Sequence, residues 1–446
     1  MARKLFGTDG IRGKADQYPL DDSTMFALGR ALARDLRGNP TVLIGMDTRE
    51  SGSRISDAIS AGIEAEGGNV WLLGVIPTPG VAWLCRESKA DAGISISASH
   101  NPWEDNGVKI FGSNGMKLAD SLEMEIEKDL RELRDEGAGE KPSRTTEKPE
   151  LIDRYENFLV SVIGSGTLEG MSIVADAGHG AAFRIAREVL EGCGAKVDLI
   201  NAEPDGRNIN EGSGALHPGA LASAVVDRKA DAGVAFDGDA DRAILVDDEG
   251  SIRDGDEILL LWAEDLDRQD KLKNSLVVST VMSNLGFENA LKAKGIALLR
   301  AKVGDKYVLE QMIENDGVLG GEQSGHVIDL LHHTTGDGIL TAISIFAIVN
   351  RSGRKFSELE TFEPAPQILV NSKVSSKPPL ESLDRYQAAA AKYENELGNR
   401  GRILVRYSGT ENLVRVMVEG EDRDRIETIA NELSEILKSE IGASEQ

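Results

Sequence analysis

The chain has 446 residues, of which 40% are hydrophobic and 28% are charged, a balance that excludes a wholly disordered protein and predicts a folded chain of about three or four domains. The formal net charge of -25 argues against nucleic acid or an acidic membrane surface as the principal partner, because both are polyanions. Two distant cysteines without CxxC spacing, no signal-peptide pattern and no apolar run of membrane-spanning length predict a cytoplasmic protein.

The N-terminal region predicts a strand–helix–strand unit preceded by a helix. The helix is expected over residues 20–37, where polar residues precede apolar residues at helical spacing. A β-branched stretch, a polar turn and a second helical pattern follow over 41–68, and residues 70–80 indicate another strand with a Pro-rich loop. Similar patterns return over 171–200 and 275–304. Three such units in succession predict three similar α/β domains with mixed, mostly parallel sheets.

The expected domain boundaries follow changes in composition. Segment 134–150 is charged, poor in large apolar residues and contains two prolines. A weaker boundary is expected near Asp254, where the acidic pattern also fits a hairpin turn. A Pro-rich segment over 362–382 introduces two strands around a glycine turn and a helix over 422–441. The sequence therefore predicts three α/β domains over residues 1–150, 151–254 and 255–366, and a smaller α+β domain over 367–446.

A serine stands at the end of the predicted strand in ISISASHNP, residues 94–102. The strand ends at Asn-Pro, which favours a turn that would hold Ser99 outward. A serine hydroxyl is a poor nucleophile at neutral pH, so a catalytic Ser99 needs a base, a metal or a group already transferred to it. A purely structural Ser-His-Asn turn fits the spacing equally well.

Three aspartates alternate beside a predicted strand in AFDGDADRAILVDDEG. Carboxylates brought together repel one another unless a hard divalent cation neutralises them, and oxygen ligands suit magnesium or calcium. An EF-hand is excluded because Arg242 replaces its glycine and Asp248 replaces its last glutamate. A solvated acidic turn is the alternative. The candidate metal ligands are Asp237, Asp239 and Asp241.

The segment GGEQSGH places Glu322, Ser324 and His326 at alternate positions. An acceptor, a hydroxyl and an imidazole that face one way could bind the hydroxyls of a sugar and move a proton, although one heptapeptide is a weak pattern. The neighbouring His332 and His333 suggest a metal pair, but adjacent side chains diverge on a strand or a helix. We therefore interpret both as structural.

Basic and hydroxyl-bearing turns near the two ends of the chain suggest phosphate binding. In RYSGTEN and the strand that follows, backbone N–H groups, hydroxyls and guanidinium groups form a donor set that a phosphate dianion accepts from; the candidates are Arg406, Ser408, Gly409, Thr410 and Arg415. A plain hairpin is the alternative. Near the N-terminus, GTDGIRG brings Arg12 among glycines, either against a phosphate or within an entry loop.

These motifs occur in a fixed order along nearly the whole chain: GTDGIRG, SASHNPWEDNGVKIF, DGDADR, VGDKYV, GGEQSGH and RYSGTEN. The sequence resembles the α-D-phosphohexomutase superfamily, and within it the phosphoglucosamine mutases. The resemblance implies an isomerase of four domains that interconverts glucosamine 6-phosphate and glucosamine 1-phosphate. It also implies a phosphorylated hexosamine as substrate and hexosamine 1,6-bisphosphate as primer and intermediate. We expect a monomer or a homodimer, and the sequence does not distinguish the two.

The resemblance assigns roles to the candidate residues. Ser99 aligns with the serine that carries the phosphoryl group and, with the three aspartates, would bind one Mg²⁺ per chain. Arg12, Lys109 and His326 would act at the reacting group, while Glu322 and Ser324 would bind sugar hydroxyls. The residues of the terminal loop would bind the phosphate that is not being transferred.

Three alternatives remain open from the sequence. A phosphoglucomutase or phosphomannomutase would share the fold, a phosphatase would share the serine and metal, and a silent sensor would only bind phosphosugars. The residues of the SASHNP and GEQSGH motifs favour glucosamine phosphate as the substrate over glucose or mannose phosphate. Asn412 departs from the proline that many relatives have in the terminal loop, which questions the rigidity of that loop but removes no phosphate donor.

Overall fold

The computed structural model describes residues 5–7, 9–137, 144–408 and 412–442. The chain forms two compact units: Met1–Thr280 with Leu298–Glu360, and Val281–Ala297 with Thr361–Gln446. Among the described residues, none of the helices combines the length and the apolar character that crossing a membrane requires.

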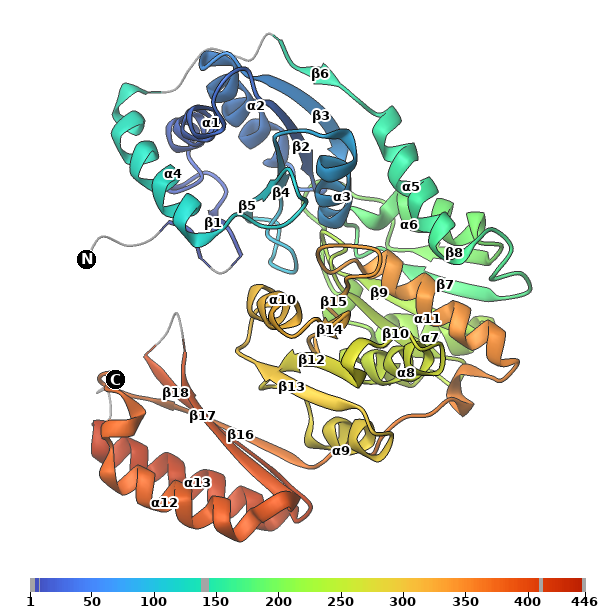
Figure 1. The fold of residues 1–446 in the computed structure, drawn as a ribbon, viewed down its shortest axis with the longest axis vertical. Helices are drawn as coiled ribbons and strands as arrows, with labels where there is room; N and C mark the ends of the chain where they lie inside the picture. Colours follow the sequence, from blue (N-terminus) through green and yellow to red (C-terminus); the bar gives the residue numbers. More distant parts are fainter. Residues whose placement is uncertain (1–4, 8, 138–143, 409–411, 443–446) are drawn as a thin grey trace. The chain divides into compact units, whose positions relative to one another are not determined.

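The first sheet of the larger unit has six strands in the order β1-β5-β4-β2-β3-β6 (Figure 1). Strand β2 pairs in parallel with β3 and β4, whereas β5 runs antiparallel to β4 and β1. The strands are β1 Ile11–Lys14, β2 Thr41–Met46, β3 Asn69–Val75, β4 Ala92–Ile96, β5 Asp105–Gly112 and β6 Thr146–Glu147. The helices of this region are α1 Asp22–Leu36, α2 Gly52–Ala65, α3 Thr78–Ser88, α4 Asp120–Leu133 and α5 Glu150–Ile163.

The second sheet has the order β11-β10-β9-β7-β8, with β7 parallel to β8 and β9 and with β10 antiparallel to β9. Its strands are β7 Ser172–Asp176, β8 Lys196–Ile200, β9 Ala232–Phe236, β10 Ala243–Asp247 and β11 Ile252–Arg253. Helices α6 Ala182–Gly192 and α7 Gly219–Arg228 connect its strands. After the β10–β11 hairpin, Asp254 caps the next helix by accepting from the backbone N–H groups of Asp256 and Glu257.

The third sheet has the order β13-β12-β14-β15, in which β12 and β14 are parallel and β14 and β15 antiparallel. Its strands are β12 Leu276–Thr280, β13 Ala297–Ala301, β14 Leu319–Gly321 and β15 Val327–Asp329. The helices of this part of the chain are α8 Gly255–Arg268, α9 Leu285–Ala293, α10 Asp305–Glu314 and α11 Gly338–Ser352, of which α9 belongs to the smaller unit.

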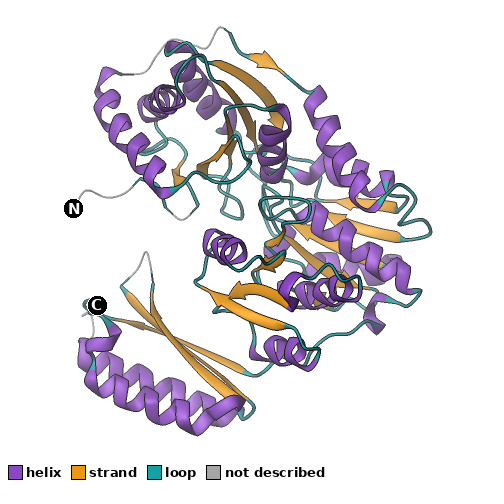
Figure 2. Ribbon diagram, viewed as in Figure 1, coloured by secondary structure: helices purple, strands orange, loops and turns teal. Residues whose placement is uncertain are grey.

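The smaller unit contains an antiparallel sheet in the order β16-β18-β17, and helices α12 and α13 lie along one face of it (Figure 2). The elements are β16 Gln367–Lys373, α12 Asp384–Leu397, β17 Gly401–Tyr407, β18 Leu413–Gly420 and α13 Arg423–Ile441. The helix predicted over 422–441 is confirmed. Asp422 caps it, and Ile426, Ile429 and Leu433 pack in the core of this unit because they share one helical face.

The predicted N-terminal helix is confirmed as α1. Asp21 begins it by accepting a hydrogen bond from the backbone N–H of Thr24, and Met25, Leu28 and Leu32 are fully buried in the core of the first sheet. Strand β4 leads into Ser99, and strand β9 leads into Asp237. Each pairs in parallel with the neighbour on one side, β2 or β7, and antiparallel with the other, β5 or β10. The carboxyl ends of parallel strands are the sheet edges at which α/β proteins place functional loops.

Candidate active site

Ser99 lies at the end of β4 and contacts the aspartate loop. Its hydroxyl donates to Asp237 Oδ2 across 2.6 Å, and its backbone N–H donates to Ser97 Oγ across 2.9 Å. The backbone of Ser99 is left-handed, with φ 54°, a conformation that is uncommon outside glycine. The surrounding residues therefore have to hold this serine in place.

Arg49 provides much of that support. Its side chain is buried, pairs with Asp47 at 2.8 Å, and donates to the backbone carbonyls of Ser99, Asn101, Pro102 and Asp105. The amide of Asn210 also donates to the Ser99 carbonyl, across 3.0 Å. A planar guanidinium with five N–H donors can bind several carbonyls at once, so Arg49 fixes the whole turn that presents Ser99.

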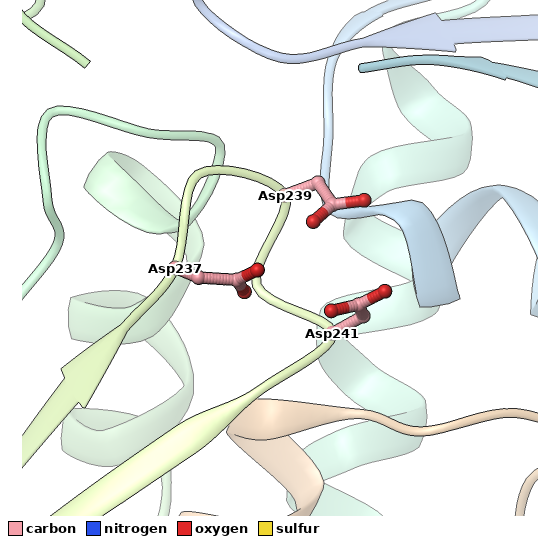
Figure 3. Close-up of side chains that lie close together, drawn as sticks. All are labelled: Asp237, Asp239 and Asp241. Atoms are coloured by element: carbon pink, nitrogen blue, oxygen red, sulfur yellow. The ribbon is translucent and has the colours of Figure 1, made fainter. Parts of the chain in front are cut away.

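The three aspartates form a buried cluster between β9 and β10. One oxygen from each of Asp237, Asp239 and Asp241 lies within 4.8 Å of the others, and Figure 3 shows the carboxylates close together on one loop. The loop packs tightly against the serine turn, since a Cβ on Gly238 would lie 2.5 Å from the Ser99 carbonyl oxygen. The loops that follow β4 of the first sheet and β9 of the second sheet therefore meet at the serine and the aspartates.

This cluster fits a hard divalent cation. Asp239 Oδ1 and Asp241 Oδ1 are buried and have no hydrogen-bond partner among the described residues, and a buried carboxylate oxygen without a donor or cation is costly. Burial and the charges of its two neighbours raise the pKa of Asp237 well above its usual range. An oxygen-only donor set of this kind is the one that Mg²⁺ and Ca²⁺ prefer.

Lys109, on β5, points at the same carboxylates. Its Nζ lies 2.9 Å from Asp239 Oδ2, 3.0 Å from Asp241 Oδ2 and 3.3 Å from Asp9 Oδ2. Burial alone would lower the pKa of Lys109, but these carboxylates outweigh it and raise the pKa well above its usual range. The side chain is therefore a fixed positive charge at neutral pH, and this arrangement favours an electrostatic role over proton acceptance.

His326 lies between β14 and β15, with Nδ1 3.7 Å from Asp241 Oδ1 and Nε2 3.8 Å from Asp305 Oδ2. Burial lowers its pKa, but Asp241, Asp305 and Glu322 outweigh this effect and the pKa is raised. The ring packs against Gly336, where a Cβ would lie 2.5 Å from the imidazole. His326 Nε2 is buried and has no hydrogen-bond partner among the described residues.

Asp241 and His326 line a cavity of about 410 Å³ within the larger unit, whose polar lining also includes Arg12, His100, Arg242 and Glu322. Arg12 and Arg242 supply positive charge there. Burial and these two arginines lower the pKa of His100 to about 4, so its ring is neutral at pH 7. Ser99 itself is 1% exposed and does not line this cavity. The adjacent His100 and Asp241 of the aspartate loop line it instead.

The sugar-binding candidates separate in the structure. Glu322 lines the cavity and accepts from the Gly304 backbone N–H across 3.0 Å, whereas Ser324 is exposed and lies outside the cavity lining. Residues 322–325 connect β14 to β15 as a turn, so side chains two residues apart need not face one way as they would on a strand. His332 and His333 also contact different groups, Asp329 and the Pro79 carbonyl.

The terminal candidates lie in the smaller unit. Arg406 on β17 and Arg415 on β18 are directly opposite each other in the antiparallel ladder. Arg415 Nε is buried and has no hydrogen-bond partner among the described residues. Ser408 follows β17 and accepts at its carbonyl from Lys377 Nζ, while Gly409 and Thr410 lie outside the described residues. Two opposed guanidinium groups can bind an anion such as phosphate.

Family models match the chain in four consecutive parts. They are the phosphoglucomutase/phosphomannomutase alpha/beta/alpha domains I, II and III, over residues 3–136, 151–250 and 254–364, and the C-terminal domain, over residues 369–436. The chain belongs to the phosphoglucomutase/phosphomannomutase family. Membership confirms the expected fold class of three similar α/β domains and a smaller C-terminal domain, and it identifies the chain as an isomerase of the phosphohexomutase type.

Relatives within the family extend over the whole chain. A phosphoglucosamine mutase of Solibacter usitatus is 47% identical and aligns over 99% of this chain and 100% of its own length. A phosphoglucosamine mutase of Chlamydia trachomatis serovar D is 44% identical, with 99% and 98% covered.

Solved structures of phosphohexomutases share the fold. A Burkholderia thailandensis phosphoglucomutase/phosphomannomutase family protein has a TM-score of 0.82 at 24% identity, with 100% of this chain and 99% of that chain covered. The N-acetylphosphoglucosamine mutase of Aspergillus fumigatus, solved in complex with GlcNAc-6P and magnesium, has a TM-score of 0.67 at 18% identity, with 98% and 96% covered.

The structure also shows residues that support the candidate site and that the motifs did not indicate. Lys117 pairs with both Asp9 and Asp305, so it joins the N-terminal loop to the start of α10 beside the cavity. The two aspartates lie inside the motifs GTDGIRG and VGDKYV, which could have indicated them. Arg49 and Asn210 gave no comparable signal, because their importance depends on contacts with a distant turn.

Proposed function

We propose that this chain is a phosphoglucosamine mutase, which interconverts glucosamine 6-phosphate and glucosamine 1-phosphate. The observation that carries the proposal is the contact between the Ser99 hydroxyl and Asp237, 138 residues later in the chain, inside a cluster of three carboxylates. Relatives described as phosphoglucosamine mutases at 44–47% identity over nearly the whole chain support the choice of substrate.

In the proposed reaction, Ser99 carries a phosphoryl group on Oγ. A hydroxyl of the substrate attacks phosphorus, the bond from phosphorus to Ser99 Oγ breaks, and hexosamine 1,6-bisphosphate forms. The bisphosphate then turns over, Ser99 Oγ attacks its other phosphate, and the sugar leaves with one phosphate while the serine is phosphorylated again. The proton lost by the attacking hydroxyl balances the proton taken up by the leaving hydroxyl.

Asp237, Asp239 and Asp241, with an oxygen of the Ser99 phosphoryl group, would hold one magnesium ion. When bound, magnesium neutralises negative charge on the phosphoryl group during transfer. Arg12 and Lys109 add fixed positive charge near the same group. His326 is the candidate for proton exchange with the sugar, which its position on the cavity wall and its unpartnered Nε2 support.

The remaining candidates would bind the rest of the substrate. Glu322 would accept hydrogen bonds from sugar hydroxyls, and Ser324 would donate to them or accept from them. The position of Glu322 on the cavity wall supports its assignment. The phosphate that is not being transferred would bind to the terminal set, Arg406, Ser408, Gly409, Thr410 and Arg415. We further propose a cytoplasmic monomer or homodimer that uses hexosamine 1,6-bisphosphate as primer.

Two measurements test the proposal. Intact-mass analysis after incubation with the bisphosphate should find one added phosphate, which peptide mapping assigns to Ser99; no added phosphate would contradict the mechanism. Comparison of kcat/KM for the 6-phosphates of glucosamine, glucose and mannose should favour glucosamine, and a preference of about tenfold or more for either other sugar would contradict the substrate assignment. Release of free phosphate without isomer would instead identify a phosphatase.

A further inference from the structure

Thr78 is a buried residue that contacts the aspartate loop at two points. It is the first residue of α3, and 2% of its surface is exposed. Its backbone N–H donates to the carbonyl oxygen of Asp239 across 3.0 Å, and its Oγ1 lies 2.6 Å from Asp239 Oδ2. A single residue of the first α/β domain therefore holds both the backbone and the side chain of a candidate metal ligand from the second.

The hydroxyl proton of Thr78 has only one consistent direction. Thr78 Oγ1 also lies 2.6 Å from the hydroxyl oxygen of Ser95, a buried residue of β4. Thr78 Oγ1 donates its only proton to Asp239 Oδ2, so the Ser95 hydroxyl donates to Thr78 Oγ1. The hydrogen bonds therefore run from the strand that leads into Ser99 to the aspartate loop.

The contact from Thr78 determines which oxygen of Asp239 is free. Asp239 Oδ2 accepts from Thr78 and, across 2.9 Å, from Lys109 Nζ. Asp239 Oδ1 is buried and has no hydrogen-bond partner among the described residues. Rotation of the carboxylate would break both contacts of Oδ2, so the two donors hold Asp239 in the orientation that leaves Oδ1 available. The carboxylate itself lies beside those of Asp237 and Asp241 (Figure 3).

We propose that Thr78 is a positioning residue for the cation site: its hydroxyl holds Asp239 Oδ2 so that Oδ1 is free to bind the cation. Through Ser95 it also links the aspartate loop to β4, the strand that leads into Ser99. The inference rests on the proposed function, because it takes the three carboxylates to be the metal site.

The test measures metal affinity directly. Mn²⁺ binding to the full chain, followed by electron paramagnetic resonance, compares the parent with Thr78→Val, which keeps the shape of the side chain but removes the donor. The dissociation constant for Mn²⁺ should rise about tenfold or more in Thr78→Val. It should stay within about threefold of the parent in Thr78→Ser, which keeps the hydroxyl. A residue that only filled space would show the opposite order, because valine conserves its volume better than serine.

An Asp239→Asn variant separates this inference from the proposed function. If Asp239→Asn binds Mn²⁺ weakly while Thr78→Val binds it as tightly as the parent, the role of Thr78 is overturned and the metal site stands. If Asp239→Asn binds as tightly as the parent, the metal site is overturned, and the inference with it.

A second variant decides the question if Thr78→Val fails to fold, as judged by circular dichroism. Ser95→Ala removes the donor to Thr78 and leaves Thr78 in place. It should raise the dissociation constant for Mn²⁺ about two- to fivefold, because the hydrogen bonds strengthen one another. An unchanged constant would count against the proposed chain of hydrogen bonds and overturn the inference.

Discussion

The serine and metal region and the terminal arginine pair arrange charge in opposite ways. Around Ser99, positive and negative groups alternate: Lys109 contacts three carboxylates, and Arg49 pairs with Asp47. In the smaller unit, Arg406 and Arg415 face each other, and no ion pair to either is present among the described residues. Burial and Arg415 lower the pKa of Arg406, whereas the carboxylates raise the pKa of Lys109.

The two charge arrangements suit two different functions. A region whose charges are already balanced is held rigidly and can stabilise charge that develops during a reaction without rearranging. A pair of like charges without a partner gains stability when an anion arrives, which suits binding and release. Removal of a charge should therefore lower both stability and turnover in the first region, and only substrate affinity in the second.

The largest expected effect is that of Ser99→Ala. Turnover should fall by about 10⁴-fold or more, because the proposed phosphoryl carrier is removed. Stability should change little, since the hydroxyl makes two hydrogen bonds, to Asp237 Oδ2 and His100 Nδ1, and each contributes about 1 kcal/mol net. A coupled assay with bisphosphate primer measures the turnover, and intact mass should show no added phosphate. A variant that keeps more than about 1% of parental turnover would break the assignment of Ser99.

The next largest effect is expected from Arg49→Met, which breaks the ion pair between Arg49 and Asp47 near Ser99. Asp47 would be left buried without its partner, so the free energy of unfolding should fall by about 3–5 kcal/mol in urea titrations. The turn that presents Ser99 would also lose four hydrogen bonds to its carbonyls, and kcat should fall about 100-fold. Loss of stability with kcat unchanged would show that Arg49 supports the fold and not the serine.

Arg415→Ala tests the pair of like charges formed by Arg406 and Arg415. KM should rise about tenfold or more with kcat little changed, because the residue would bind the ground and transition states alike. The melting temperature should not fall, since repulsion from Arg406 is relieved. Arg402, on the same sheet, is a matched control because it pairs with Glu419. Arg402→Ala should lower the melting temperature and leave KM unchanged; an Arg415→Ala variant with that same pattern would contradict the comparison.

The sequence was sufficient for some of the helices and strands and for the loops that meet at the cluster. Helical spacing located α1 and α13, and motif composition selected Ser99 and the aspartates, because these signals are local. The support provided by Arg49, Thr78 and Asn210 could not be predicted, since each binds a group 50 or more residues away. The alternation of Glu322, Ser324 and His326 predicts side chains that face one way, as on a strand, but the segment forms a turn.

A smaller effect is expected from pH, at a buried imidazole outside both charged regions. His333 Nε2 donates to the Pro79 carbonyl across 3.0 Å, and Nδ1 accepts from the backbone N–H groups of Thr334 and Thr335. Both nitrogens are therefore used by one neutral tautomer. Burial and the charge of Arg86 lower the pKa of His333 to about 3, below its ordinary value of 6.5.

Because the folded-state pKa of His333 is lower, its contribution to stability is complete above pH 6.5 and is lost as pH falls toward 3, at about 1.4 kcal/mol per pH unit. Urea unfolding at pH 7 and pH 5 should show a smaller loss on acidification in His333→Gln than in the parent. His332 is the matched control: its hydrogen bond to Asp329 raises its pKa, so its contribution is present at low pH and lost as pH rises. His332→Gln should therefore increase the loss on acidification, and equal slopes in the two variants would contradict the assignment of a neutral, buried His333.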